Sequence, residues 1–173
     1  MNVFMSFQLI PLIQPIPAIV AVIAAVAAGA GAGAYFSLRL KKREETLRDL
    51  TQMLCEMSIL IRHRRLSVDE LFSELSRYDF IGNLGDSDKN WRENWDYIAQ
   101  GYTCLKPPER DVLKAVGRSL GTSDTEGQLA MLKTNAKLLE AFRAEASGEY
   151  VSKGKLYRTC GVLAGIFAAV LII

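Results

Sequence analysis

Charged side chains are confined to the middle of this sequence. All 21 lysines and arginines and all 19 aspartates and glutamates lie between Arg39 and Arg158, so the first 38 residues and the last 15 carry no charged side chain. Uncharged segments of this length do not suit the surface of an ordinary soluble domain, which is rich in charged residues. The pattern therefore excludes a free cytosolic enzyme, and an apolar share of 50% excludes a disordered chain.

The first uncharged segment predicts a transmembrane helix at residues 18–38. It consists mainly of alanine, valine, isoleucine and glycine. About 21 helical residues extend about 31 Å, which matches a bilayer core of about 30 Å. A cleaved signal peptide is the alternative. The basic residues of a signal peptide precede its apolar run, whereas here the first basic residue, Arg39, follows it, so the anchor is preferred.

The two ends of the chain are assigned in the same way. Residues 1–17 are predicted to form an outward-facing extension and a poor helix, because they contain three prolines. Residues 156–173 predict a second transmembrane helix in which Arg158 snorkels to the interface. A re-entrant segment or a buried hydrophobic tail is the alternative, because the uncharged part alone is short for a span.

Basic residues flank both apolar segments on the side of the middle domain. By the positive-inside rule, this domain, residues 39–155, is predicted to lie in the cytoplasm. When the seven bases that flank the apolar segments are set aside, the chain has 14 basic and 19 acidic residues, a net charge of −5. Nucleic acid is therefore not an expected partner, because its binding depends on bases that neutralise phosphates. The flanking residues are Arg39, Lys41, Lys42, Arg43, Lys153, Lys155 and Arg158.

Apolar residues in the middle domain recur at helical spacing. Capping boxes at 67–70 and 123–126, and the prolines after Lys106, predict helix starts within the domain. A helix is expected to end near Gly148, before the last one begins. Alternating apolar and polar runs are absent, so we predict an all-α, membrane-anchored bundle of about six helices. One narrow seam follows a 3-4 spacing and comprises Leu47, Leu50, Leu54, Met57 and Ile61.

The sequence contains few residues suited to catalysis. Its three cysteines, Cys55, Cys104 and Cys160, are far apart, and His63 is the only histidine. No P-loop sequence occurs, and neither a metal nor a cofactor is expected. Cys55 and Cys160 are predicted to pack as small apolar residues. The alternative is a membrane-bound thiol hydrolase that uses His63 and one cysteine.

A basic cluster of Arg62, Arg64 and Arg65 is the first candidate partner-binding site. On an acidic domain it would suit an acidic partner surface or lipid headgroups. The alternative is a solvated helix end, in which the cations complement the negative end of the helix dipole.

A polar cluster between two predicted helices is the second candidate partner-binding site. It comprises Gly121, Thr122, Asp124 and Gln128. The alternative is a simple helix–helix corner, with Gly121 in the left-handed conformation.

Small residues in both apolar segments predict close helix packing. Gly29 and Gly33 are four residues apart, and so are Gly161 and Gly165. This spacing lets helix backbones approach each other in membranes. The partner of each motif is either the other segment or a second copy of the chain.

Four parts of the sequence carry a resemblance to a known family. They are the Tyr-Phe-Ser-Leu-Arg-Leu run at 35–40, the pair Trp91 and Trp95, the Leu-Gly-Thr-Ser-Asp…Gln corner at 120–128 and the tail at 156–165. Both tryptophans also have the spacing of core residues. From about residue 18 to its end, the chain resembles the stage III sporulation protein AB family of endospore-forming bacteria.

The resemblance implies a non-enzymatic component of the trans-envelope complex between mother cell and forespore. The soluble part of that family is similar to the F-type platform domain of type II secretion systems. The implied partners are a cytoplasmic secretion-type ATPase and other stage III membrane proteins of the same operon. Apart from the resemblance, the basic cluster, the apolar segments and their glycines predict membrane lipids and further copies of the chain as partners. The implied location is the mother-cell membrane around the forespore. The alternative is a membrane-anchored adaptor or sensor unrelated to sporulation.

Overall fold

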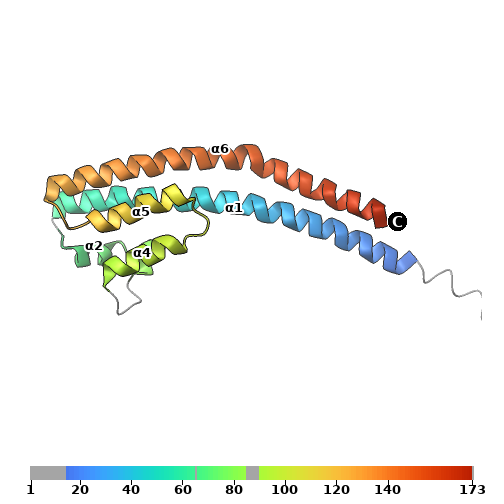
Figure 1. Cartoon of the computed structure of the whole chain (residues 1–173), viewed down its shortest axis with the longest axis horizontal. Coiled ribbons are helices and arrows are strands. Elements are labelled where there is room, and N and C mark those ends of the chain that lie inside the picture. Colours follow the sequence, from blue (N-terminus) through green and yellow to red (C-terminus); the bar gives the residue numbers. More distant parts are fainter. Residues whose placement is uncertain (1–14, 65, 85–89, 173) are drawn as a thin grey trace, which may run out of the picture. The chain divides into compact units, whose positions relative to one another are not determined.

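The computed structural model describes residues 15–64, 66–84 and 90–172. Over these residues the protein is helical and contains no strand, which confirms the all-α prediction (Figure 1). Six helices are described there: α1 (Pro15–Arg64), α2 (Val68–Glu74), α3 (Asp79–Gly82), α4 (Trp91–Gly101), α5 (Pro107–Ser119) and α6 (Thr125–Ile172).

The chain divides into two compact units. Unit 1 holds the described residues up to Arg39 and those from Glu149 onward, and unit 2 holds Leu40–Gly148. Helices α1 and α6 each run through both units, with one segment of each helix in unit 1 and the other in unit 2. Unit 2 also contains the four shorter helices.

Unit 1 consists of the apolar segments of α1 and α6. Both helices are long and apolar enough to cross a membrane, with stretches of mean hydropathy 1.7 and 1.3. Large apolar side chains project outward instead of packing inside the unit, as expected where lipid is the solvent. The exposed ones are Val20, Ile23, Tyr35, Phe36, Leu38, Val151, Leu156, Tyr157, Val162, Leu163, Ile166, Phe167, Val170 and Leu171.

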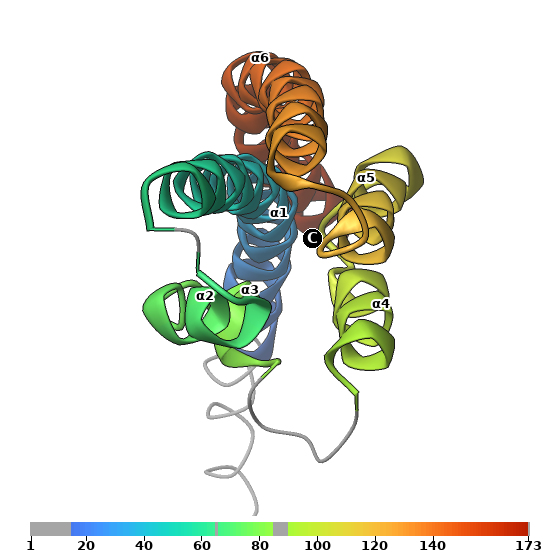
Figure 2. The ribbon, with the colours of Figure 1, turned by 90° about the vertical axis from the view of Figure 1, so that its left-hand side faces the viewer.

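The core of unit 2 forms where the predicted α1 seam meets α6. All five seam residues are buried, as predicted. They share one cluster with apolar residues of α6 and with Trp95 of α4, whose side chain is completely buried. Helices α4 and α5 lie side by side (Figure 2). The α6 members of the cluster are Leu129, Leu132, Ala136, Leu139 and Ala146.

Local capping chemistry explains most helix starts in unit 2. The Ser67 hydroxyl accepts a hydrogen bond from the Glu70 backbone N–H, and the Glu70 carboxylate accepts one from the Ser67 backbone N–H, so the predicted capping box is present. Two prolines occupy the first turn of α5. Backbone N–H groups in a first turn have no partner within the helix, so proline, which has no N–H, is tolerated there. The short helix α3 was not predicted from the sequence.

Three helix boundaries differ from the predictions. Helix α6 runs without a break past Gly148, because one glycine costs a helix only about 1 kcal/mol. Its N-cap is Asp124, whose carboxylate accepts a hydrogen bond from the Gly127 N–H at 3.1 Å, and not Ser123. Helix α1 begins at Pro15, within the segment expected to be a poor helix, because prolines are tolerated in a first turn. The rest of that extension, residues 1–14, lies outside the described residues.

Candidate functional site

A cleft of about 230 Å³ opens at the end of unit 2 where α1 ends and α6 begins. We call it the end cleft (Figure 2 faces this end). Its lining comes from the end of α1, the start of α2 and the start of α6, so Arg62 and Arg64 of the basic cluster and Gln128 of the polar cluster lie at the same end of unit 2. The lining residues are Ile61, Leu66, Ser67, Val68, Leu71, Thr125 and Gln128.

Gln128 holds the corner between α5 and α6 in shape. Its side-chain oxygen accepts a hydrogen bond from the Gly121 N–H at 3.3 Å, and its amide nitrogen donates to the Ser123 carbonyl at 3.0 Å. Gly121 has a φ of +73°, the left-handed conformation anticipated for it. The Gln128 side chain is thus engaged within the corner and fixes one wall of the end cleft.

The other polar residues of the corner are also engaged within it. The Thr122 hydroxyl donates to the Ser119 carbonyl at 2.8 Å, and Asp124 caps α6. These contacts satisfy backbone groups at the end of one helix and the start of the next. The corner residues therefore define the shape of the surface at this end of unit 2.

The basic cluster forms the last turn of α1. Arg62 and His63 are exposed. Arg64 is also exposed, and its guanidinium pairs with the Glu74 carboxylate of α2 at 2.6 Å. Arg65 lies outside the described residues. Arg62 and His63 follow directly on Ile61 of the cleft lining, and Arg62 also lines a separate groove between α1 and α6.

Acidic residues at this end of unit 2 lie in the first turns of helices, at the positive end of the helix dipole. Asp69 and Glu70 occupy the first turn of α2, and Glu126 occupies the first turn of α6. Negative charge is stabilised at helix N-termini, just as the α1 cations are stabilised at a C-terminus. Hydrogen bonds from the backbone N–H and the hydroxyl of Ser67 lower the pKa of Glu70 below its usual value. The surface therefore presents a basic turn beside two acidic ones.

The apolar lining of the end cleft was missed in the sequence. Leu66 precedes the Ser67 N-cap, and Leu71 is the fourth residue of α2, which are the two positions of a hydrophobic staple. This pattern could have identified Leu66 as an ordered residue between the two predicted clusters. Val68 also lines the cleft and is half-buried.

The glycines of both apolar segments meet in unit 1. A Cβ atom built on Gly29 would lie 2.8 Å from the Gly165 Cα, and one on Gly161 would lie 2.9 Å from the Gly33 Cα. The structure thus brings all four predicted packing glycines into backbone contact between α1 and α6. One turn further along, the Arg158 guanidinium donates to the Ser37 hydroxyl at 3.0 Å.

The cysteines do not occupy the predicted positions. Cys55 and Cys160 are exposed, contrary to the expectation that both pack as small apolar residues. Cys55 is next to the α1 seam but about 100° round the helix from Leu54, which places it outside the core. Cys104 is half-buried, and its sulfur lies 3.6 Å from the Thr46 hydroxyl. Within the described residues, no three His, Cys, Asp or Glu side chains are grouped to hold a metal.

Comparison with known proteins identifies the family. The family model for stage III sporulation protein AB matches residues 18–173. The chain belongs to this family. Stage III sporulation protein AB of Bacillus subtilis (strain 168) is 32% identical over 110 residues, which are 61% of this chain and 60% of that relative's length. No solved structure matches the chain. Membership of the stage III sporulation protein AB family gives the protein a sporulation-related role. It favours this role over that of an adaptor or sensor unrelated to sporulation.

Proposed function

We propose that this protein is a non-enzymatic platform in the stage III channel complex between mother cell and forespore. It couples a cytoplasmic secretion-type ATPase to other stage III membrane proteins of its operon, in the manner of a type II secretion F-type platform. The observation that carries the proposal is the family match over residues 18–173. Two apolar helices and an all-helical unit 2 support it, because they suit a scaffold held at a membrane.

The proposed location is the mother-cell membrane around the forespore, with unit 2 in the cytoplasm. Basic residues beside both apolar segments support this orientation. Arg43 is one of the seven flanking bases, but it is buried in an ion pair of unit 2, so the other six carry the argument. The exposed apolar side chains of unit 1 would contact membrane lipids or further copies of the chain.

The proposed contact for the ATPase is the end cleft together with the last turn of α1. Half-buried Leu66 and Val68 would supply an apolar centre, and exposed Arg62 and His63 would supply a polar rim. Protein interfaces commonly have this arrangement. Arg62 would face an acidic surface of the ATPase, and the corner residues would keep the cleft in shape.

Co-purification with the ATPase tests this contact. We expect Arg62→Glu and Leu66→Asp in the full-length protein to reduce recovery of the ATPase from sporulating cells. Arg118→Glu is the matched control, because Arg118 is also exposed but pairs with Asp96 of α4 and lies outside the cleft lining. Equal recovery with all three variants would remove the end cleft as the contact.

Labelling of a native cysteine tests the orientation. Exposed Cys55 of unit 2 is kept, while Cys104 and Cys160 are changed to serine. In intact vegetative cells, a membrane-impermeant maleimide should label Cys55 only after lysis. A second variant with Asn2→Cys as its sole cysteine should be labelled before lysis. The reverse pattern would place unit 2 outside, where a cytoplasmic ATPase has no access.

A further inference from the structure

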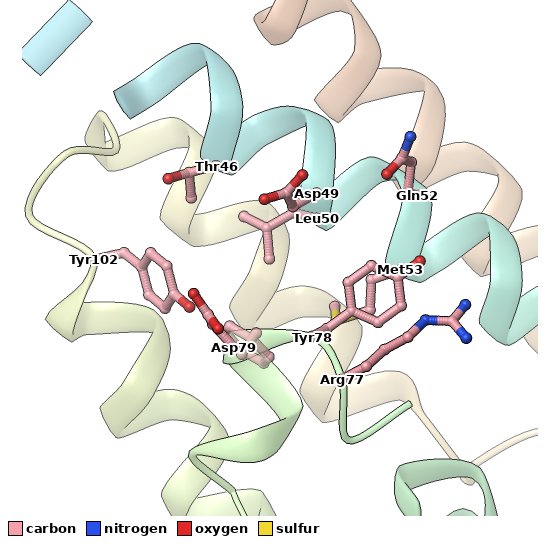
Figure 3. Close-up of a pocket in the computed structure, with 10 residues that line it drawn as sticks. Thr46, Asp49, Leu50, Gln52, Met53, Arg77, Tyr78, Asp79 and Tyr102 are labelled. Atoms are coloured by element: carbon pink, nitrogen blue, oxygen red, sulfur yellow. The ribbon is translucent and has the colours of Figure 1, made fainter. Parts of the chain in front are cut away.

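A second cavity in unit 2, of about 360 Å³, combines acidic and aromatic side chains. Figure 3 shows the Asp49 and Asp79 carboxylates and the Tyr102 hydroxyl facing the same part of this pocket. Buried Leu50, Met53 and Phe80 form its apolar floor. It shares no lining residue with the end cleft.

The negative charge of the pocket is not neutralised by its own basic residue. Arg77 is the one basic residue among the lining residues, and its guanidinium pairs with Glu56, away from the two aspartates (Figure 3). Within the described part of the chain, the Asp79 carboxylate has no cationic partner. The pKa of Tyr102 is raised to about 12, first by burial and next by the negative charge of Asp79. Asp49 pairs with Arg48 of its own helix at 3.6 Å, where both side chains are exposed. Asp79 therefore contributes most of the negative potential directed into this partly dehydrated space.

The rim of the pocket already shows how such groups hold a guanidinium. Arg77 lies over the Tyr78 ring, with its Cζ 5.2 Å from the ring centroid. It pairs with Glu56, and the Tyr78 hydroxyl donates to the same carboxylate at 2.8 Å. A carboxylate beside an aromatic ring is a strong combination for arginine, which stacks on rings and binds carboxylates through its planar fork. Inside the pocket the aspartates and Tyr102 repeat these groups.

We propose that this pocket binds an arginine side chain presented by a partner protein. The aspartates bind the guanidinium from two sides, the Tyr102 ring lies against its face, and the apolar floor receives the methylene stem. The volume is sufficient for one extended side chain, and the acidic lining excludes an acidic one. This inference does not depend on the identity of the ATPase, so it can fail while the proposed function stands.

Fluorine NMR of the full-length protein in lipid nanodiscs tests the proposal. The tyrosines are replaced by 3-fluorotyrosine, and Tyr102→Phe identifies the Tyr102 resonance. The probe is N-acetyl-arginine amide, and its uncharged isostere, N-acetyl-citrulline amide, is the control. We expect the arginine probe to shift the Tyr102 resonance in the millimolar range and the citrulline probe to leave it unchanged.

Variants of the aspartates locate the binding. We expect Asp49→Asn and Asp79→Asn each to weaken binding of the arginine probe about two- to fivefold, as for partly exposed ion pairs. Asp111→Asn should have no effect, because Asp111 is exposed on α5 outside the pocket. Three results would overturn the proposal. They are equal shifts with both probes, displacement of the arginine probe by Ca²⁺, and a shift that follows protein concentration alone, which would make a second copy the occupant.

Discussion

Arg43 on α1 and Glu109 on α5 form a buried ion pair, although 66 residues separate them in sequence. The Arg43 Nε donates to the Glu109 carboxylate at 3.0 Å, and the two residues are only 4% and 0% exposed. The same carboxylate accepts the Lys106 backbone N–H at 2.7 Å, and Glu145 of α6 lies 3.7 Å from the Arg43 guanidinium. The pair thus joins three helices of unit 2.

Breaking this pair from one side is predicted to destabilise unit 2 strongly. Arg43→Met leaves the buried Glu109 carboxylate without its charged partner, which costs about 3–5 kcal/mol. Urea unfolding of the purified protein in micelles measures the change in the free energy of unfolding. The double variant Arg43→Met/Glu109→Leu should recover most of the loss.

An exposed pair on the same helix provides the control for this prediction. Lys41→Met removes the ion pair of Lys41 with Glu45, where both side chains are more than 40% exposed. Solvent screening limits the expected loss to less than about 1 kcal/mol. If the buried and exposed variants lost equal stability, burial of Arg43 would not matter.

Alanine in place of Gly33 is predicted to loosen the packing of unit 1. Its Cβ would lie 2.5 Å from the Tyr157 carbonyl oxygen, so α1 and α6 must separate. Overpacking of this kind costs about 1–3 kcal/mol. Gly31→Ala is the matched control, because a Cβ there meets nothing within 4 Å. The melting temperature in micelles should fall for Gly33→Ala and should hold or rise for Gly31→Ala.

Alanine at Gly117 is predicted to displace Trp95. The added Cβ would lie 2.7 Å from two atoms of the indole ring, and the Trp95 Nε1–H donates to the Leu113 carbonyl at 2.8 Å. A loss of about 1–3 kcal/mol is expected, with a red shift of tryptophan fluorescence as water reaches the ring. Gly101→Ala, with open space around its Cβ, should leave the spectrum unchanged.

The capping box of α2 predicts a pH-dependent effect of Ser67→Ala. The Ser67 groups lower the pKa of Glu70. A lowered pKa in the folded state contributes stability above the unfolded pKa, and this contribution is lost as the pH falls through the folded value. The stability difference between wild type and Ser67→Ala should therefore be largest at neutral pH and shrink by about pH 3. A difference that is constant with pH would contradict the role of Glu70.

Tyr102 predicts a late step in alkaline titration. Burial, and then the charge of Asp79, raise its pKa to about 12. A raised pKa contributes stability below the unfolded value, near 10, and this contribution is lost as the pH rises through the folded value. Tyr102→Phe should remove the last step in tyrosinate absorbance, and Asp79→Asn should move it to lower pH. The Asp111→Asn variant should titrate like the wild type.

Local patterns in the sequence predicted much of this fold. The seam from Leu47 to Ile61 and the Ser67 capping box depend on residues a few positions apart, and both are present. The sequence analysis explained Arg43 only as a flanking base, and Glu109 follows directly on the prolines that predicted a helix start. Their pairing depends on how distant helices pack, which no local pattern shows.

The candidate sites were also predictable only where their residues lie close together in the sequence. The corner at 120–128 was recognisable from its turn and cap residues, but its contact with the α2 start appears only in the folded unit. The acidic pocket draws Asp49, Asp79 and Tyr102 from three distant segments and had no sequence signal. Helix α3 has four residues, too few for a periodic pattern.

The glycine contact of unit 1 restricts how this protein can change in evolution. In many helix pairs, a larger side chain on one side is offset by a smaller one on the other. Here Gly33 already faces Gly161, and the atoms that an added Cβ would meet belong to the α6 backbone. No replacement on α6 is smaller, so a genetic screen for second-site suppressors of Gly33→Ala should recover true revertants and no exchange at position 161.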